Sequence, residues 1–468
     1  MRPDLAVPIR RGPSLALAFL LIAAACGGAP ASPSPGASAS AASSLAPSAA
    51  AEPSASPGEP AVEPAPGSDS EIYAPNPGAI VVAIDPGHGG CLDWGVPDPS
   101  ERGVELAEKT LVLEIAELLR DRLEEDGVHV VMLREGDEAL AGDFEPDFGC
   151  EGAEWRDVDG DGTAGFEETG RIRTRDELQA RIDRANLSGA DAFVSIHVNS
   201  LTENGVVFEL AATQTFYDDE TPWGAEASAP LADAVQDGVV SALESLAGYE
   251  RQDRRTDAVA YYAISRTWAE GDTCEVAGDE WCKPHRGVLM PGVLAEVGSI
   301  TLRAEHDLLA SPAGQEAVAS GLFGGLAGWF AGRGLAARVE LASAETGAAP
   351  QPVAGDGPPF WAPVVDGDEV RLRVTNTGAQ PIGPGAELVG GWAVSDEPYL
   401  AAAPAELGAL GGPLPALDPG ESLEVVVVLP QRPGNARALA WISLSVEGET
   451  LADLGSPAFQ IASKDARP

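Results

Sequence analysis

Residues 80–90 read IVVAIDPGHGG. Five apolar residues, 80–84, are followed at once by a turn rich in proline and glycine. A short run that is apolar on both faces is typical of a buried strand in a parallel sheet. The turn places His88 just beyond the carboxyl end of that strand, where open α/β sheets bind their ligands. This stretch therefore predicts both the fold class and the position of a functional site.

The sequence after this turn alternates between helical and strand patterns. Apolar residues at helical spacing predict helices, the first ending before Gly127 and the second opening with a Thr174–Glu177 capping box. Short apolar runs predict the strands between them. The expected helices are 108–126, 174–187, 227–247 and 312–332, and the further strands are 128–133, 191–196 and 292–296. We therefore expect an α/β domain with a mostly parallel sheet flanked by helices.

Two of the five histidines directly follow predicted strands. These are His88 and His197, while Glu296 ends another strand and Glu108 opens the helix after the first strand. Side chains at the carboxyl ends of neighbouring parallel strands meet in one crevice. Two imidazoles and a carboxylate are a typical donor set for a catalytic Zn²⁺ with one open position. The pattern predicts a metal site, whereas each histidine alone is equally well explained as a hydrogen-bonded turn residue.

These residues lie in four motifs whose order resembles the zinc-dependent N-acetylmuramoyl-L-alanine amidases of the amidase-3 type. The resemblance covers residues 79–332, and its motifs are 84–90 (IDPGHGG), Glu108-Lys109, Arg181 and Asn186 leading into 195–199 (SIHVN), and 293–298 (VLAEVG). It implies that His88, Glu108 and His197 bind zinc and that Glu296 is the catalytic carboxylate. It also implies a peptidoglycan substrate, cleaved at the amide between the muramic acid lactyl group and L-Ala of the stem peptide.

Several alternatives stay open beside this resemblance. Glu105, one helical turn before Glu108, is a rival ligand, although Lys109 and the following helix align with Glu108. Ser195 and Asn199 flank a ligand and are candidates either for orienting it or for shaping the turn. The chain after Glu296 differs from the usual family pattern, which affects the expected substrate contacts. The alternative functions are a zinc peptidase acting on the stem peptide and a non-catalytic wall-binding lipoprotein.

The other three histidines have different expected positions. His129 lies within a predicted strand and is expected to pack in the core. His306 is expected in solvent, and His285 is a candidate for lining the cleft because it lies near an insertion.

Two insertions, about 136–172 and 268–285, interrupt the family pattern. The first fits the calcium-loop pattern D-x-D-x-D-G-x₅-E, which predicts a structural Ca²⁺ site as the alternative to a plain acidic surface insert. Its candidate ligands are Asp157, Asp159, Asp161, Thr163 and Glu168. Cys150 in this insertion is a candidate disulfide partner of Cys91, and Cys274 and Cys282 are expected to close a small loop in the second insertion.

The first 25 residues have the pattern of an export signal. Arg2, Arg10 and Arg11 precede a short apolar run, 15–25, which is too short to span a bilayer as a helix. The run ends Ala-Ala-Ala-Cys26, which resembles a bacterial lipobox and predicts that Cys26 becomes a lipidated N-terminus. We expect a membrane-anchored lipoprotein of the cell envelope outside the cytoplasm, with ordinary signal cleavage and secretion as the alternative.

Residues 26–71 are mostly Ala, Ser, Pro and Gly and are expected to form a disordered tether before the catalytic domain, 72–335. Turn residues and short alternating strands at 369–374, 422–429 and 438–445 predict an immunoglobulin-like sandwich over 345–465. This module has three open roles: binding wall glycan, docking an unknown regulator, or spacing the enzyme. With 29 Lys and Arg against 73 Asp and Glu, the net charge of −44 argues against nucleic-acid partners.

Overall fold

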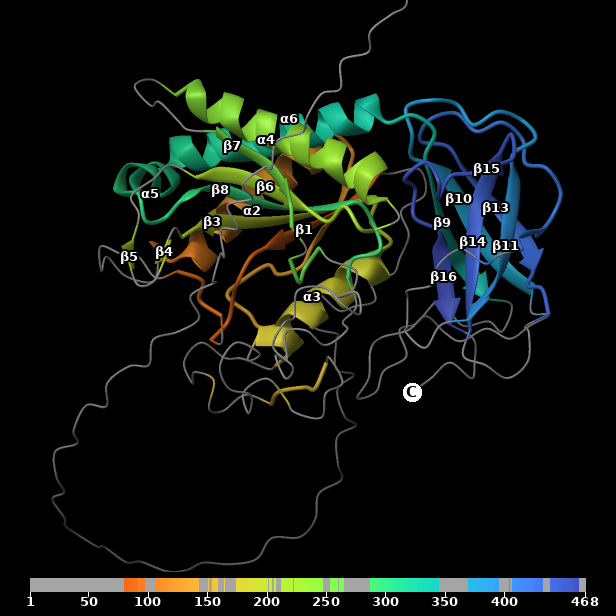
Figure 1. Cartoon of the computed structure of the whole chain (residues 1–468), viewed down its shortest axis with the longest axis horizontal. Coiled ribbons are helices and arrows are strands. Elements are labelled where there is room, and N and C mark those ends of the chain that lie inside the picture. Colours follow the sequence, from red (N-terminus) through yellow and green to blue (C-terminus); the bar gives the residue numbers. More distant parts are fainter. Residues whose placement is uncertain are drawn as a thin grey trace, which may run out of the picture.

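The computed structural model describes residues 80–462 apart from gaps, the longer of which are 97–105, 143–149, 159–173 (except Ala164), 208–211, 247–252, 265–286, 345–368, 395–403 and 432–437. Several sequence predictions lie outside the described residues: the signal peptide 1–25, Cys26, the linker 26–71, Glu105, Cys274, Cys282 and His285. Two folded parts follow one another along the chain, a helix-covered sheet and an all-β module (Figure 1).

The first part is built on a six-stranded sheet with the order β2-β1-β3-β8-β6-β7. Its strands are β1 (Val81–Pro86), β2 (His129–Met132), β3 (Ala192–Asn199), β6 (Thr213–Tyr217), β7 (Asp253–Ala258) and β8 (Gly292–Ser299). All neighbours are parallel except β6 and β8, which are antiparallel. The mostly parallel sheet is thus confirmed. The sequence analysis missed β6 and β7; β7 (DRRTDA) is polar throughout because it is an edge strand with little to bury.

Helices cover both faces of this sheet. They are α2 (Glu108–Glu125), α3 (Arg175–Ser188), α4 (Ala229–Glu244), α5 (Arg303–Leu309) and α6 (Pro312–Gly332). Apolar residues of α2, α4 and α6 share one core with one face of β1, β3 and β8, whereas α3 packs on the other face (Figure 1). In the contact between α4 and α6, a Cβ on Gly321 would lie 2.6 Å from the Gly238 carbonyl oxygen, so glycine allows the two helices to approach closely.

Two local predictions in this domain are wrong. The Thr174 side chain makes no capping hydrogen bond; the Glu177 carboxylate instead accepts the Ala141 N–H and pairs with Arg181 at 3.0 Å, because both partners are buried beside it. His306 is 1% exposed rather than in solvent, since α5 turns it toward the Leu106 carbonyl oxygen. His129 opens β2 and is half-buried, so it packs at the edge of the core.

The second part consists of two antiparallel sheets. One has the order β13-β10-β9 and the other β12-β11-β14-β15, with β16 also paired to β14. Their strands are β9 (Ala337–Ala344), β10 (Glu369–Asn376), β11 (Glu387–Val394), β12 (Gly408–Ala409), β13 (Ser422–Val428), β14 (Ala438–Val446), β15 (Glu449–Thr450) and β16 (Phe459–Ala462). Side chains of both sheets, such as Leu372 and Ile442, share one buried core, as in a sandwich. The immunoglobulin-like connectivity stays a prediction.

The boundary of this module lies earlier than residue 345. β9 begins at Ala337 and pairs with β10 along its length, so residues 337–344 belong to the module. The strand has only eight residues and follows soon after a long helix. Its buried apolar side chains, Ala337, Val339 and Leu341, alternate with polar ones. This pattern becomes clear only when the partner strand is known.

A buried ion pair joins the two parts. The Arg338 guanidinium on β9 donates to Asp191, which lies just before β3, and both residues are less than 10% exposed. Asp191 also accepts the Val81 N–H at 2.9 Å. The module therefore contacts the amino-terminal end of β3, opposite the end that carries His197. Among the described helices, none combines the length and apolar character needed to cross a bilayer.

Candidate metal centre

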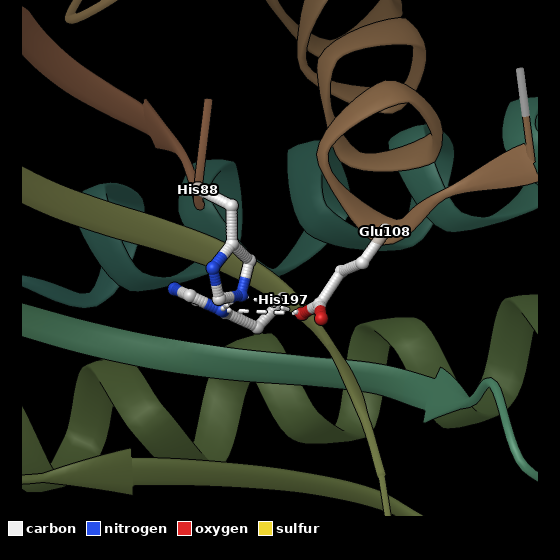
Figure 2. Close-up of side chains that lie close together, drawn as sticks. All are labelled: His88, Glu108 and His197. Carbon is white, nitrogen blue, oxygen red and sulfur yellow. Dashed lines mark hydrogen bonds and ion pairs between the residues drawn. The ribbon is translucent and has the colours of Figure 1, made fainter. Parts of the chain in front are cut away.

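His88, Glu108 and His197 converge on one point (Figure 2). Glu108 Oε1 lies 3.0 Å from His88 Nε2 and 3.3 Å from His197 Nδ1, and the two nitrogens are 3.1 Å apart. The Glu108 side chain is 4% exposed, whereas those of His88 and His197 are 19% and 17% exposed. The structure thus brings together the three predicted ligands, with the two imidazoles partly exposed and the carboxylate buried.

The register of β1 and β3 explains why the two histidines meet. Asp85 and Pro86 pair with Ser195 and Ile196, so the residues that follow both strands emerge side by side. His88 adopts a left-handed conformation, with φ of 61°, and the two glycines after it also have positive φ. A non-glycine residue rarely adopts this conformation, which here turns the imidazole back toward β3.

Glu108 is fixed by backbone groups on both sides of the site. Its Oε1 accepts the Val198 N–H and its Oε2 accepts the Val96 N–H, each at 3.0 Å. These bonds explain how the first side chain of a helix is held over a neighbouring strand. Burial opposes ionisation of Glu108, but His88 and His197 lower the pKa of its carboxyl group, so the carboxylate form is present.

Gly87 is required because the His197 ring lies against it. A Cβ at this position would lie 2.5 Å from His197 Nε2, well inside van der Waals contact. We therefore expect Gly87→Ala to displace His197 and to lower metal affinity and activity by about 100-fold, as small misplacements in catalytic sites do. Gly136→Ala is the matched control, because a Cβ there meets nothing within 4 Å. Equal zinc affinities of the two variants in a chelator competition would contradict this account.

A buried polar network lies beneath the histidines. Arg181 donates to Asp85 Oδ1 at 2.7 Å, to the Pro86 carbonyl at 2.9 Å and to the His88 carbonyl at 2.5 Å. Ser195 Oγ donates to Asp85 Oδ2 at 2.7 Å. Burial opposes ionisation of Asp85, but Arg181 and Ser195 lower the pKa of its carboxyl group. Ser195 therefore holds Asp85, and Arg181 holds the turn that carries His88.

Two further buried cations donate hydrogen bonds to the turn that carries His88. Arg134, which is fully buried, donates to the carbonyls of Pro86 at 2.8 Å and Gly87 at 3.1 Å. Lys109 Nζ donates to the Gly90 carbonyl at 2.9 Å. Sequence reasoning named Lys109 and Arg181 only as parts of motifs. The third cation, Arg134, directly follows a predicted buried strand. A charged residue at such a position is the signal that could have identified it.

Asn199 makes a different kind of contact from that of Ser195. It ends β3 as a buried residue, and its backbone carbonyl accepts the Ile300 N–H at 2.9 Å. This bond fastens the end of β3 to the end of β8, which supports the turn-shaping interpretation of Asn199.

Glu296 stands beside the triad. On β8 it pairs in register with His197 on β3. Its Oε2 is buried and has no hydrogen-bond partner among the described residues. Burial and the neighbouring Glu108 charge raise the pKa of Glu296 well above its ordinary value, an effect that His88 partly offsets. A carboxyl group with an oxygen that has no partner among the described residues, and with a pKa shifted in this way, suits proton transfer.

The first insertion is tied to the loop that follows His88. Cys91 and Cys150 form a disulfide, with Cα atoms 5.5 Å apart. Asp157 is described and half-buried, whereas Asp159, Asp161, Thr163 and Glu168 lie outside the described residues. The calcium site therefore stays a prediction.

The donors fit a divalent cation. Two imidazole nitrogens and a carboxylate oxygen, all within 4.8 Å of one another, form the set typical of catalytic zinc with an open position. The unpaired oxygen of Glu296 is a further sign that a polar group belongs beside it.

Several known proteins are similar to this chain. The family model of N-acetylmuramoyl-L-alanine amidases of the amidase-3 type matches residues 82–327. The germination-specific N-acetylmuramoyl-L-alanine amidase of Bacillus subtilis is 28% identical over 255 residues, which are 54% of this chain and 81% of that protein. Among solved structures, an N-acetylmuramoyl-L-alanine amidase from Clostridium difficile 630 is 23% identical, with a TM-score of 0.37 over 55% of this chain and all of that one. The catalytic domain of CwlV, an N-acetylmuramoyl-L-alanine amidase from Bacillus (Paenibacillus) polymyxa var. colistinus, is 23% identical, with a TM-score of 0.35 over 53% of this chain and 97% of that one. Because the family model spans more than half of the sequence, the chain belongs to the N-acetylmuramoyl-L-alanine amidase family.

Proposed function

We propose that this protein is a zinc-dependent amidase that hydrolyses peptidoglycan between the lactyl group of N-acetylmuramic acid and L-Ala of the stem peptide. The observation that carries the proposal is the convergence of His88, Glu108 and His197 beside Glu296, whose Oε2 has no partner among the described residues. Membership of the amidase family supports the reaction class and the substrate class. The donor set supports zinc over harder cations, which prefer sites made of oxygen ligands.

In this proposal each residue has a separate task. Zinc held by His88, Glu108 and His197 would polarise the amide carbonyl and make water more acidic. Glu296 accepts a proton of the attacking water and delivers it to the amide nitrogen, so the C–N bond breaks with a neutral amine as the leaving group, and the lactyl carbon keeps the oxygen of the water. Its raised pKa makes it a stronger proton acceptor than an ordinary carboxylate.

We also propose where the enzyme acts. The signal-like segment 1–25 and Cys26 support export and lipid anchoring outside the cytoplasm, and the linker 26–71 would let the catalytic domain reach the wall. Ca²⁺ bound at 157–168 would be structural. For the β module we favour a role in placing the catalytic domain, because the buried Arg338–Asp191 pair fixes one to the other.

Digestion of purified sacculi tests the activity. We expect the protein to release stem peptides with a free L-Ala amino group, leaving glycan with free lactyl carboxylates, as measured by mass spectrometry. Removal of metal with a strong chelator should reduce the rate at least 100-fold, and added Zn²⁺ should restore it. Cut stem peptides would instead indicate the peptidase. Wall binding without released products, in protein shown to contain zinc, would indicate a non-catalytic binder.

A further inference from the structure

We propose that Asp93 is a positioning residue that makes His88 present Nε2 to the metal. This inference rests on the metal site of the proposed function, but not on the identity of the substrate. Asp93 belongs to none of the motifs that the sequence analysis singled out.

The two ring nitrogens of His88 face different partners. Nδ1 lies 2.7 Å from Asp93 Oδ1, whereas Nε2 lies 3.0 Å from Glu108 Oε1 and 3.1 Å from His197 Nδ1. An ionised carboxylate only accepts hydrogen bonds, so Nδ1 carries the proton. Nε2 also faces the Glu108 carboxylate, and a metal held by the triad would replace any proton shared there, so the neutral imidazole keeps its proton on Nδ1 and offers the Nε2 lone pair.

Asp93 is itself held firmly. Its backbone carbonyl accepts the Gly89 N–H at 2.7 Å, which closes the turn that follows His88. Its Oδ1 also accepts the Gly95 N–H at 3.3 Å. The Asp93 side chain is 20% exposed, so the bond to His88 is partly shielded from water. Such a carboxylate can fix the tautomer and the orientation of a ligating histidine.

The same short loop, 91–96, reaches a second ligand. The Val96 N–H donates to Glu108 Oε2 at 3.0 Å, and the start of the loop is fastened by the Cys91–Cys150 disulfide. One loop therefore sets both His88 and Glu108, with Asp93 at its centre. His197 faces the triad through Nδ1 and His88 through Nε2, and Asp93 occupies the other ring nitrogen of His88.

Zinc titration of metal-free protein, in competition with a coloured chelator, measures the effect. We expect Asp93→Ala to weaken zinc binding 10- to 100-fold. Asp93→Asn should lose less, because its amide oxygen still accepts a hydrogen bond but carries no charge. Asp237→Asn is the control: Asp237 is an exposed carboxylate on α4, outside the site, so the zinc affinity of this variant should stay within about 2-fold.

Nitrogen NMR of the zinc-loaded wild type gives a second readout that a purely structural role would not move. The zinc-bound His88 ring should carry its proton on Nδ1, and Asp93→Ala should make this proton exchange faster with solvent, because it loses its hydrogen-bond acceptor. In activity assays, kcat should fall while KM changes little. His88 protonated on Nε2 in the wild type, or unchanged zinc affinity in a folded Asp93→Ala protein, would overturn the inference. If Asp93→Ala fails to fold, the wild-type spectrum and the Asp93→Asn titration decide.

These outcomes separate the two proposals. A wild-type protein that binds zinc with the expected tautomer but cleaves no sacculi would refute the proposed activity and leave the role of Asp93 standing. Cleavage of sacculi together with a His88 ring protonated on Nε2 would refute the role of Asp93 and leave the proposed activity standing. A wild-type protein that binds no zinc would end both.

Discussion

Glu296→Gln is expected to lower kcat on sacculi by about 100- to 10,000-fold while the bound zinc stays at the wild-type level. The substitution keeps the size of the side chain but removes its ability to accept a proton. Zinc content should be unchanged because Glu296 is not one of the three converging donors. The measurements are the rate of product release by mass spectrometry and the zinc content by elemental analysis.

The control is Glu244→Gln, an exposed carboxylate at the end of α4. It should cleave at the wild-type rate. Cleavage by Glu296→Gln at that same rate would rule out Glu296 as the proton-transfer group. Loss of zinc from this variant would instead place Glu296 among the ligands.

Arg181→Met should destabilise the protein by about 3–5 kcal/mol, because the variant leaves the buried charges of Asp85 and Glu177 uncompensated. For a domain of this size, that corresponds to a Tm lower by roughly 10 °C. Zinc affinity should also fall, since Arg181 no longer binds the His88 carbonyl. Circular dichroism during heating measures the first effect and chelator competition the second.

Arg303→Met is the matched control for this prediction. Arg303 pairs with Asp307 at 3.5 Å, but its side chain is 71% exposed, so its loss should cost less than about 1 kcal/mol. Equal Tm values for the two variants would show that burial of the Arg181 network contributes nothing.

The pH dependence of the same comparison has a defined sign. In the folded protein the pKa of Asp85 is lowered from its ordinary value of 3.8. The pairing of Asp85 with Arg181 therefore contributes fully to the free energy of unfolding above pH 3.8, and this contribution is lost as the pH falls through the folded-state pKa. Below that pH, Asp85 is protonated and Arg181 has one charge fewer to compensate. The difference in Tm between wild type and Arg181→Met should therefore shrink in acid.

Local patterns predicted most of the regular structure. Helix α6 has the predicted bounds, Pro312–Gly332, and β1, β2, β3 and β8 lie where short apolar runs occur. These segments bury a continuous apolar stripe or run, which is visible within the segment itself. Strands β7 and β9 were missed because one is a polar edge strand and the other shows its buried face only against β10.

By itself, the sequence determined the order of most elements and, through His88, His197 and Glu296 at the carboxyl ends of predicted strands, the end of the sheet where chemistry is possible. The tertiary structure alone decided how those side chains are held. Arg181 grips Asp85 across 96 residues, Asp93 selects the His88 nitrogen, and Glu177 leaves its predicted capping role for a buried partner. Such contacts join segments distant in the chain, and their strength comes from burial, which no local pattern of residues records.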